Sequence, residues 1–571
     1  MRDLEIPAPA DRGRRYRATE ALPGCVSWLV LALPVALVPV LPPGGFVVAG
    51  VALVAAAAVA VVASNVAALR GYRSMRRHLA LPWARLLADL DDPAATAGPR
   101  DPPWHRAHLA ARGTGPPPGG RAADVVHAII IATWTESRHV LEPTVQAVRA
   151  AAYDPSQLIL VVAYEARGGA EAERRAHRLV DDHRNDFGQV MAVRHDDRPG
   201  EFPGKGANIT SAGRALAAHV TAAGIDPGRV VVTTLDADTR PHPCYLAALT
   251  YAWCTVPDPR RVSFQPIALY VSNAWDVPAP CRVVAATSSL WNVVLSRRPR
   301  LIRNFSAHAQ GLAALVAMDF WSVHTVVEDG HHFWRSWFHF DGRYRVHPLP
   351  VPIYQDAVLS ASLVRTLRAQ FVQLRRWAWG ASDVAYVIDK GWCTPNTVPR
   401  RELAAKLARL LVGHVMWATA PLLFTAAQVL AVVLPIERAA PPGTLAAVAG
   451  LKVVALGGLG LGIGVSLRLL PPRPARHPRR RWSSMVLQWT LLPVTGLAYS
   501  AASALSSQTR LVTGRYLERF DLTEKAVVTE SGARLVDERT SPRHPSTAVT
   551  GAGAPLAGSP DRGGEGEGDG S

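Results

Sequence analysis

Long apolar runs at both ends of the chain constrain its fold more than any other feature. Two lie near the N-terminus, from Ala21 to Leu41 and from Phe46 to Leu69, and two more extend from Leu410 to Leu434 and from Leu445 to Leu470. A helix of about 20 mainly apolar residues is long enough to cross the hydrocarbon core of a bilayer. The sequence therefore predicts membrane helices on both sides of a central, more polar domain.

The charges beside the first two runs predict how they cross the membrane. Arginines between positions 12 and 17 precede the first run, and others between 70 and 77 follow the second. Because basic residues are retained on the cytoplasmic side, both ends of this hairpin are expected there. A basic start before an apolar stretch is also typical of a cleaved signal peptide, but a second full-length run follows at once and no clear cleavage site precedes it.

A third C-terminal run, from Val486 to Ala504, is interrupted by Pro493 and Gly496. The arginine-rich stretch 473–481 before it indicates a cytoplasmic loop. If the run crossed fully, the polar tail would lie outside the cell. We expect instead a re-entrant or interfacial segment, shielded by protein, that keeps the tail inside.

Between the membrane regions, short β-branched runs alternate with longer helical stretches. A Pro-, Gly- and Arg-rich stretch ending near residue 121 is read as a linker. Beyond it we expect strands at 125–132, 158–163, 190–194 and 230–235, with helices at 140–152, 170–184 and 207–223 between them. This alternation predicts right-handed crossovers and a mainly parallel sheet, with ligands at the carboxyl ends of its strands.

Two carboxylates follow the last of these strands. Asp236 and Asp238 stand on either side of Ala237, directly after 230–235. Carboxylates in this position can hold one divalent cation, Mg²⁺ or Mn²⁺, which can bridge to a diphosphate. A solvated turn at a strand end is the alternative, because short motifs recur by chance.

A second acidic pair, Glu328 and Asp329, precedes an aromatic stretch rich in histidine. Beside a metal site, Asp329 could accept the proton of an attacking hydroxyl while Glu328 holds a partner. An acidic pair favoured by the dipole at a helix N-terminus is the alternative. His331 and His332 have no matching ligands at zinc-like spacing, so we expect them to pack or to support the site.

The third motif lies in an amphipathic stretch from Leu363 to Tyr386. Gln373, Arg376 and Trp377 fall at i, i+3 and i+4 of a helix and therefore share one face. Such a face can bind phosphate through the guanidinium and stack a sugar ring on the indole. The alternative is an interfacial helix with arginine and tryptophan at the level of the lipid headgroups.

In this order, the three motifs resemble those of the membrane-integrated family-2 glycosyltransferases, the relatives of cellulose, chitin and hyaluronan synthases. The resemblance covers about residues 125–388. It implies a GT-A-like, Rossmann-like α/β fold with a mainly parallel sheet, flanked by transmembrane helices. The motif residues take these implied roles: Asp236 and Asp238 contact nucleotide and metal, Asp329 is the base, and Gln373, Arg376 and Trp377 form the acceptor and diphosphate platform.

Two lysine segments extend the resemblance. The chain has only five lysines. Lys205 lies in a segment similar to the family's lysine segment before the DxD strand, which places it at the nucleotide. Residues 520–525 are similar to the synthases' FxVTxK gating loop, with leucine for valine, and by that likeness Thr523 and Lys525 close over the donor. A chance match in a polar tail explains the second segment equally well.

Two departures from the family pattern concern the nucleotide. The turn after the first strand retains only Glu136 of the usual residues, and after the second strand Glu165 is the nearest carboxylate to the position of the usual base-reading aspartate. Both are expected at the donor. The identity of the donor's base stays open, with a UDP-sugar as the expected donor.

These signals divide the chain into seven expected segments. They are a cytoplasmic N-terminus (1–20), a transmembrane hairpin (21–69), a basic linker (70–121), a catalytic domain with interfacial helices (122–400), a C-terminal membrane region (401–508), a candidate gating segment (509–529) and a disordered tail (530–571).

The function that the resemblance implies is that of an inverting glycosyltransferase in the plasma membrane, multi-pass, with its catalytic domain in the cytoplasm. It would move a sugar from a nucleotide-diphosphate sugar to a hydroxyl of a glycan or of a lipid-linked acceptor. A divalent cation would assist, Asp329 would be the base, and membrane lipid would be a partner.

Two other classes of function remain open. One is an inactive, membrane-anchored protein that binds nucleotide sugar or acts as a scaffold. The other is a binder of nucleic acid or anionic lipid, suggested by the net charge of +17. Many arginines border the apolar runs, where membrane topology already explains them, so no nucleic-acid partner is expected. Five scattered cysteines without a CxxC pair indicate neither a zinc site nor a disulfide framework.

Overall fold

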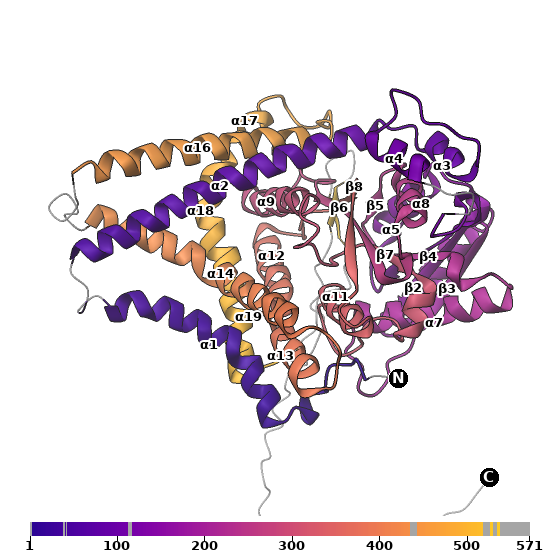
Figure 1. The fold of residues 1–571 in the computed structure, drawn as a ribbon, viewed down its shortest axis with the longest axis horizontal. Coiled ribbons are helices and arrows are strands. Elements are labelled where there is room, and N and C mark those ends of the chain that lie inside the picture. The colour runs from indigo at the N-terminus through magenta and orange to yellow at the C-terminus, as the bar shows by residue number, and fades with distance from the viewer. Residues whose placement is uncertain are drawn as a thin grey trace, which may run out of the picture. The chain divides into compact units, whose positions relative to one another are not determined.

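A mixed β-sheet with helices on both sides forms the polar part of the chain (Figure 1). The computed structural model describes residues 3–37, 40, 43–111, 117–433, 442–517, 526–528 and 534–536. Within them, eight strands pair in the order β3-β2-β1-β4-β7-β6-β8-β5. Their bounds are Val126–Thr133 (β1), Leu158–Glu165 (β2), Gln189–His195 (β3), Val230–Asp236 (β4), Arg240–Pro241 (β5), Val262–Tyr270 (β6), His308–Gly311 (β7) and Arg345–Gln355 (β8). A separate hairpin pairs β9 (Ala526–Val528) with β10 (Arg534–Val536).

The four predicted strands are confirmed as β1 to β4, each within two residues of its expected bounds, and they are parallel to one another. The predicted crossover helices are α5 (Arg138–Arg149), α6 (Gly169–Asp182) and α7 (Lys205–Ala222). Near-continuous runs of Val and Ile form these strands because both faces of a parallel sheet are covered by helices.

The other half of the sheet was not predicted. β7 is antiparallel to β4 and β6, β6 is parallel to β8, and β5 is antiparallel to β8. β7 has only four residues and β8 contains three prolines, so neither shows the usual strand pattern. The sheet is therefore mixed, although most of its strands are parallel.

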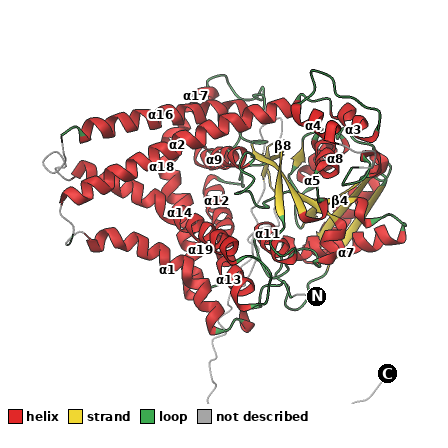
Figure 2. Ribbon diagram, viewed as in Figure 1, coloured by secondary structure: helices red, strands yellow, loops and turns green. Residues whose placement is uncertain are grey.

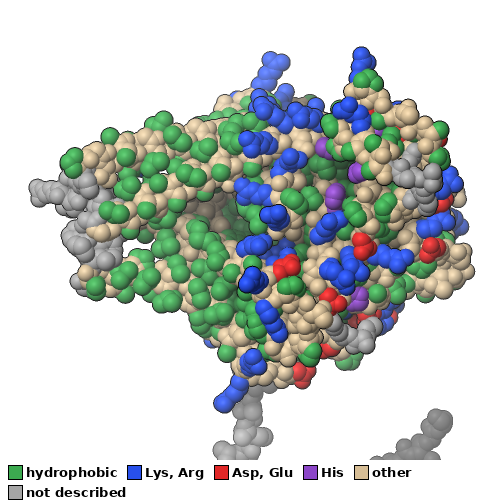
Figure 3. All heavy atoms as spheres, viewed as in Figure 1, with side chains coloured by type: hydrophobic (Ala, Val, Ile, Leu, Met, Phe, Trp, Pro, Cys, Tyr) green, Lys and Arg blue, Asp and Glu red, His purple; other side chains and the backbone are tan. Residues whose placement is uncertain are grey.

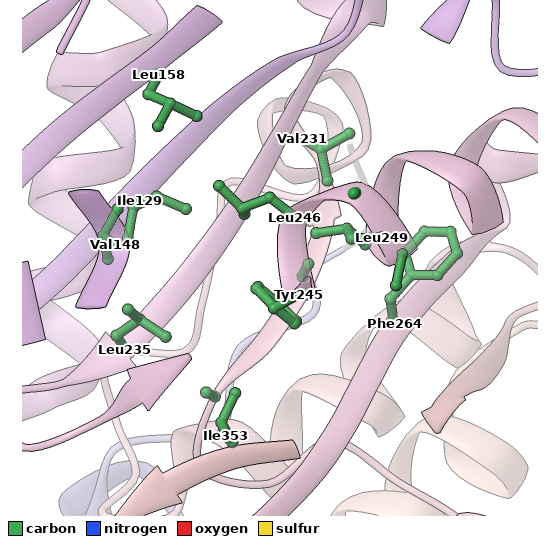
Figure 4. Packing of buried hydrophobic residues seen from close by; sticks show 14 of the residues in the cluster. Ile129, Val148, Leu158, Val231, Leu235, Tyr245, Leu246, Leu249, Phe264 and Ile353 are labelled. Carbon is green, nitrogen blue, oxygen red and sulfur yellow. The ribbon is translucent and has the colours of Figure 1, made fainter. Parts of the chain in front are cut away.

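Each face of the sheet has its own apolar core. On one face, α8 (Tyr245–Thr255) packs with α5, and Figure 4 shows Tyr245, Leu246 and Leu249 of α8 gathered with Val231 of β4 and Phe264 of β6. On the other face, α7 and α10 (Leu312–Ala317) cover β1 and β4. The two layers hold the carboxyl ends of the parallel strands in place.

The segment expected to be a linker contains two helices, α3 (Trp83–Asp91) and α4 (Pro103–Ala111). Both pack on α8 through aromatic rings: the Tyr251 ring lies 5.9 Å from that of Trp83 and 5.0 Å from that of Trp104. The proline and glycine around these helices concealed them, although their own residues are good helix formers. Packing of a few large rings on α8 holds both helices in place.

Among the described residues, four helices are long and apolar enough to cross a membrane. They are α1 (Arg14–Leu37), α2 (Pro43–Leu79), α14 (Arg400–Val433) and α16 (Thr444–Leu469). α2 runs along α16, and α1 lies beside α14 (Figure 2). Figure 3 shows apolar side chains over these helices and a band of Lys and Arg where they meet the α/β part. Exposed apolar surface of this extent is typical of contact with lipid.

The remaining helices connect the sheet to these long helices. They are α9 (Ala279–Leu295), α11 (Glu328–His339), α12 (Leu363–Ala378), α13 (Asp383–Ile388), α17 (Arg481–Leu487), α18 (Leu492–Thr495) and α19 (Ala502–Thr513). Between α17 and α19 the helical path changes to a 3-10 turn, to α18 with Pro493, and to a π-helical turn (Gly496–Ala501). In Figure 1 the stretch from α18 to α19 crosses the direction of α2 and α16 and does not run along it.

Candidate active site

The motifs found in the sequence meet at one cavity of about 740 Å³, at the carboxyl edge of the parallel strands. All of the described candidate residues line it: Glu136, Glu165, Lys205, Asp236, Asp238, Glu328, Asp329, Gln373, Arg376 and Trp377. Thr523 and Lys525 lie outside the described residues. Segments far apart in the sequence thus contribute polar groups to a common space.

Lys205, the first residue of α7, lies at the centre of the carboxylates. Its Nζ is 2.8 Å from Oδ1 of Asp236, 3.1 Å from Oδ2 of Asp329 and 3.6 Å from Oε1 of Glu328, and it also donates to the Ser306 carbonyl at 3.2 Å. Burial alone would lower the pKa of this ammonium, but the three carboxylates together raise it. Lys205 is therefore a charged counterion for all three acids.

A glycine allows α7 and α11 to begin so close together. A Cβ on Gly206 would lie 2.5 Å from the carbonyl oxygen of Ser322 and 3.1 Å from the Cβ of Glu328. Real Cβ atoms do not approach a carbonyl oxygen so closely, so a side chain here would force the two helix starts apart. Gly206 thereby keeps Lys205 within reach of the acids.

Glu328 and Asp329 begin α11 and line the cavity, Glu328 buried and Asp329 half-buried. Burial raises the pKa of Asp329 well above its usual value, the charge of Lys205 opposes this rise, and Glu328 and Asp236 add to it. Burial also raises the pKa of Glu328, against the charges of Lys205 and Arg376. Burial lowers the pKa of His308, 3.6 Å from Asp329, to about 3, so it is neutral near pH 7. These carboxylates repel one another and favour nearby cations.

The two DxD carboxylates have different partners. Oδ2 of Asp236 accepts hydrogen bonds from Ser306 Oγ at 3.1 Å and Gln355 Nε2 at 3.0 Å, while its Oδ1 faces Lys205. Oδ2 of Asp238 accepts from the backbone N–H of Asp356 at 3.3 Å. Asp236 thus faces the lysine, and both carboxylates line the cavity, where a cation could reach them.

The donor set fits a hard cation. Asp238 and Asp356 both line the cavity and offer carboxylate oxygens, which suit Mg²⁺ or Mn²⁺, although Asp356 also lies 3.5 Å from Arg240. The described residues contain one group of three His, Asp or Glu ligand atoms within 4.8 Å of one another, Asp89, Asp101 and His105, and it lies outside the cavity. A cation at Asp238 would therefore complete its coordination with oxygens of a bound molecule.

The face of α12 forms another wall. The amphipathic stretch expected from Leu363 to Tyr386 is one helix only as far as Ala378, beyond which a 3-10 turn leads into α13. Ser362 caps α12 by accepting from the N–H of Arg365 at 3.3 Å. The Trp377 ring lies 5.7 Å from that of Tyr270 at 38°, and Gln373 accepts from Gln370 at 3.3 Å. Arg376 is close enough to Glu328 to oppose the rise in its pKa. A cation and an aromatic surface thus lie beside the acids.

Glu136 and Glu165 both lie at strand ends but hold protein groups. Oε2 of Glu136 accepts from Oγ1 of Thr133 at 3.0 Å and from the N–H of Trp134 at 2.8 Å. Glu165 pairs with Arg167, whose guanidinium lies 4.0 Å from the centroid of the Trp134 ring. Together they support a flat Trp134–Arg167 surface at one end of the cavity.

Sequence reasoning missed several lining residues. They are Trp134, Arg167, Tyr270, Arg303, Ser306, Gln355 and Asp356. Tyr270 and Gln355 end β6 and β8, so the strand-end rule would have found them if those strands had been recognised. Ser306 and Arg303 lie on a loop without a local signal.

His331 and His332 are buried, as expected, and hydrogen-bond to protein groups. His331 lies 2.8 Å from Asp383, and His332 lies 2.7 Å from Gln310.

The N-terminal segment holds α11 from outside the cavity. Arg335 of α11 donates to Oε2 of Glu5 at 2.9 Å, Ser322 also bonds Glu5, and the hydroxyl of Tyr386 donates to the Leu4 carbonyl at 2.9 Å. Leu4 and Ile6 are buried in the core next to this helix. The first residues of the chain therefore support the helix that carries Asp329.

Glu5→Ala should lower the free energy of unfolding by about 1–3 kcal/mol, because it leaves the buried Arg335 without its carboxylate. Thermal unfolding in detergent measures this change. Asp11→Ala is the matched control, since Asp11 is an exposed carboxylate in the same N-terminal segment. Equal unfolding temperatures for the two variants would contradict the anchoring role.

Comparisons with known proteins give structural likenesses only. No protein-family model and no curated protein sequence matches the chain. The mannosyltransferase PcManGT from Pyrobaculum calidifontis, solved with GDP-Man and Mn²⁺, is 16% identical, with 80% of this chain and 98% of that chain covered and a TM-score of 0.36. S. aureus TarS 1-349, solved with UDP-GlcNAc, is 10% identical, with 72% of this chain and 96% of that chain covered and a TM-score of 0.32. GalNAc-T7, solved with UDP, GalNAc and Mn²⁺, is 11% identical, with 51% of this chain and 58% of that chain covered and a TM-score of 0.30. These TM-scores are low, so we argue the function from the residues of the site.

Proposed function

We propose that this protein is a membrane-bound glycosyltransferase of the family-2 type, which moves a sugar from a nucleotide-diphosphate sugar to a hydroxyl acceptor. One observation carries the proposal: Lys205, the two acidic motifs and the Gln-Arg-Trp face of α12 line a single cavity. Positive charge for a diphosphate, a carboxylate for a hydroxyl proton and an aromatic surface for a sugar are the parts that such a transfer needs.

The donor would lie along the strand ends. The flat Trp134–Arg167 surface suits stacking of a nucleobase, with a UDP-sugar as the preferred donor. Lys205 and Arg376 would face the diphosphate, where their charges stabilise the leaving group. Asp238, with Asp236 beside it, would hold the divalent cation, which supplies further positive charge to the diphosphate when bound.

The reaction is a single displacement with inversion. The acceptor hydroxyl oxygen attacks the anomeric carbon, the bond from that carbon to the diphosphate breaks, and the hydroxyl proton passes to Asp329. Trp377 and Tyr270 would hold the acceptor sugar, while Gln373 orients it by hydrogen bonding. No covalent enzyme intermediate is needed.

The membrane setting is part of the proposal. The band of Lys and Arg where the apolar helices meet the α/β part supports a catalytic domain on the cytoplasmic side of the plasma membrane (Figure 3). The crossing path of α18 and α19 supports an interfacial segment in place of a third C-terminal span. The same band accounts for the basic charge without a nucleic-acid partner.

Transfer itself tests the proposal. Membranes containing the protein are incubated with a panel of radiolabelled nucleotide sugars, with and without Mg²⁺ or Mn²⁺, and the label is followed into lipid-soluble, polymeric and free-sugar fractions. A labelled product with one donor supports the enzyme. Nucleotide-sugar binding without any transfer or hydrolysis would instead favour an inactive binding protein.

The pH dependence follows from the raised pKa of Asp329. A base must be ionised, so turnover should fall as the pH decreases through that pKa, which lies well above the ordinary value of about 4. Initial rates at saturating donor between about pH 5 and 9 measure this, with nucleotide affinity at each pH as the control. A rate that stays constant from about pH 9 down to about pH 5 would contradict the role of Asp329.

A further inference from the structure

The cavity continues beyond the catalytic carboxylates, between helices of the membrane region. Its far part is lined by Trp291 of α9, Trp417 of α14 and Thr495 of α18. Trp291 is 48% exposed although it is a large apolar residue. Figure 3 shows this face hollowed among apolar side chains. The space that holds the acids is therefore continuous with a surface suited to an apolar chain.

A cation faces this far part of the cavity. Arg303 lies on the loop between α9 and β7, and its guanidinium stands 4.7 Å from the Trp334 ring centroid and 5.9 Å from that of Phe333. In the part of the chain that the structure describes, it has these ring contacts but neither a hydrogen bond nor an ion pair with a carboxylate. Burial lowers the pKa of Arg303 to about 10, so it is still charged near pH 7.

The groups around Arg303 do not neutralise it. Arg409 of α14 adds positive charge, and Lys406 of the same helix lies over the Phe333 ring at 5.3 Å. The negative charge of Asp383, on α13, attracts Arg303, but the Asp383 carboxylate also lies 2.8 Å from His331. The carboxylate of Glu402 lies 3.9 Å from Lys406. Positive charge therefore exceeds negative charge at this end of the cavity.

A second polar group faces the same space. His414 of α14 lines the cavity, within electrostatic range of Arg303, and its buried Nδ1 has no hydrogen-bond partner among the described residues. A half-buried cation without a carboxylate and a buried ring nitrogen without a hydrogen-bond partner are both unfavourable. A bound anion would relieve both, because it attracts the guanidinium and accepts hydrogen bonds from either group.

We propose that Arg303, with His414, binds a phosphate group of an acceptor whose apolar chain lies against α9 and α14. This inference rests on the proposed function, and it selects a lipid-linked acceptor over a free neutral glycan. The phosphate is held and not consumed: the acceptor's hydroxyl oxygen forms the new bond to the anomeric carbon, the bond to the diphosphate breaks, and the proton passes to Asp329. Binding of the phosphate at Arg303 would set how far the lipid-linked acceptor extends into the cavity.

Binding of dodecyl phosphate tests this inference without any need for turnover. The full-length protein in nanodiscs of neutral lipid is titrated with dodecyl phosphate, dodecanol or inorganic phosphate, and tryptophan fluorescence reports binding because Trp334 and Trp417 border the site. We expect dodecyl phosphate to bind at least tenfold more tightly than either other probe. Arg303→Gln should weaken its binding by about 10- to 100-fold, while Arg303→Lys retains most of it.

Arg300→Gln is the matched control, because it removes an exposed positive charge from the same loop and should bind dodecyl phosphate like the unchanged protein. Nucleotide binding monitors folding and should be equal in all variants. Unchanged dodecyl phosphate binding by Arg303→Gln would overturn the proposal. A loss of nucleotide affinity in Arg303→Gln as large as its loss of dodecyl phosphate affinity would also overturn it, because Arg303 would then belong to the donor site. Inorganic phosphate binding as tightly as dodecyl phosphate would overturn the apolar part. Arg303-dependent binding in a protein that transfers no sugar would contradict the proposed function alone.

Discussion

Asp329→Asn should leave nucleotide-sugar binding largely intact and reduce turnover by about a hundredfold or more. Asparagine has nearly the same shape and can still accept from Lys205, which now lies 3.1 Å from Asp329 Oδ2, but it cannot take up the proton of the acceptor hydroxyl. Equilibrium binding of the labelled donor and initial rates of transfer, measured on the same preparation, separate the two effects.

Asp319→Asn is the matched control for this substitution. Asp319 pairs with Arg214 at 2.8 Å on the surface, and its φ of +54° is a conformation that asparagine tolerates as well as aspartate. We expect its turnover to equal that of the unchanged protein. Undiminished turnover in Asp329→Asn would exclude Asp329 as the base, whatever the control shows.

Lys205→Met should abolish donor binding and lower the free energy of unfolding by about 3–5 kcal/mol. The substitution preserves the length of the side chain but removes the one charge that faces Asp236, Glu328 and Asp329 together. The acids are then left buried without a counterion, and the diphosphate loses a positive contact. Thermal unfolding and nucleotide binding at neutral pH measure the two losses.

The stability of Lys205→Met should also depend on pH in a definite direction. The pKa of Asp329 is raised in the folded protein relative to the unfolded chain, so the folded state binds more protons between the two values. Stability therefore rises as the pH falls through the raised pKa, and the variant should recover part of its loss in mild acid.

Arg106→Met serves as the control for Lys205→Met, because Arg106 is an exposed cation on α4, away from the cavity. Its unfolding temperature and nucleotide affinity should match those of the unchanged protein. If Lys205→Met also matched them, Lys205 would not be the counterion that its contacts indicate.

Much of the fold was predictable because its signals are local. The Val- and Ile-rich runs that became β1 to β4 are contiguous, and the i, i+3, i+4 spacing of Gln373, Arg376 and Trp377 already implied one helix face. The candidate residues were found in the same way, from strand ends and short motifs. The helices α3 and α4 were not predicted because proline and glycine surround them. Strands β5 to β8 were not predicted because they depend on pairing between distant segments.

By itself, the sequence determined the apolar helices, the parallel half of the sheet and the motif residues, because hydropathy and side-chain periodicity act over a few neighbouring positions. Only the tertiary structure decided that Lys205 meets Asp329, 124 positions away, that Gln355 and Ser306 hold Asp236, and that Arg303 faces the cavity without a carboxylate. Such contacts depend on how the crossovers and the mixed sheet bring distant segments together, and no local pattern in the chain encodes that distance.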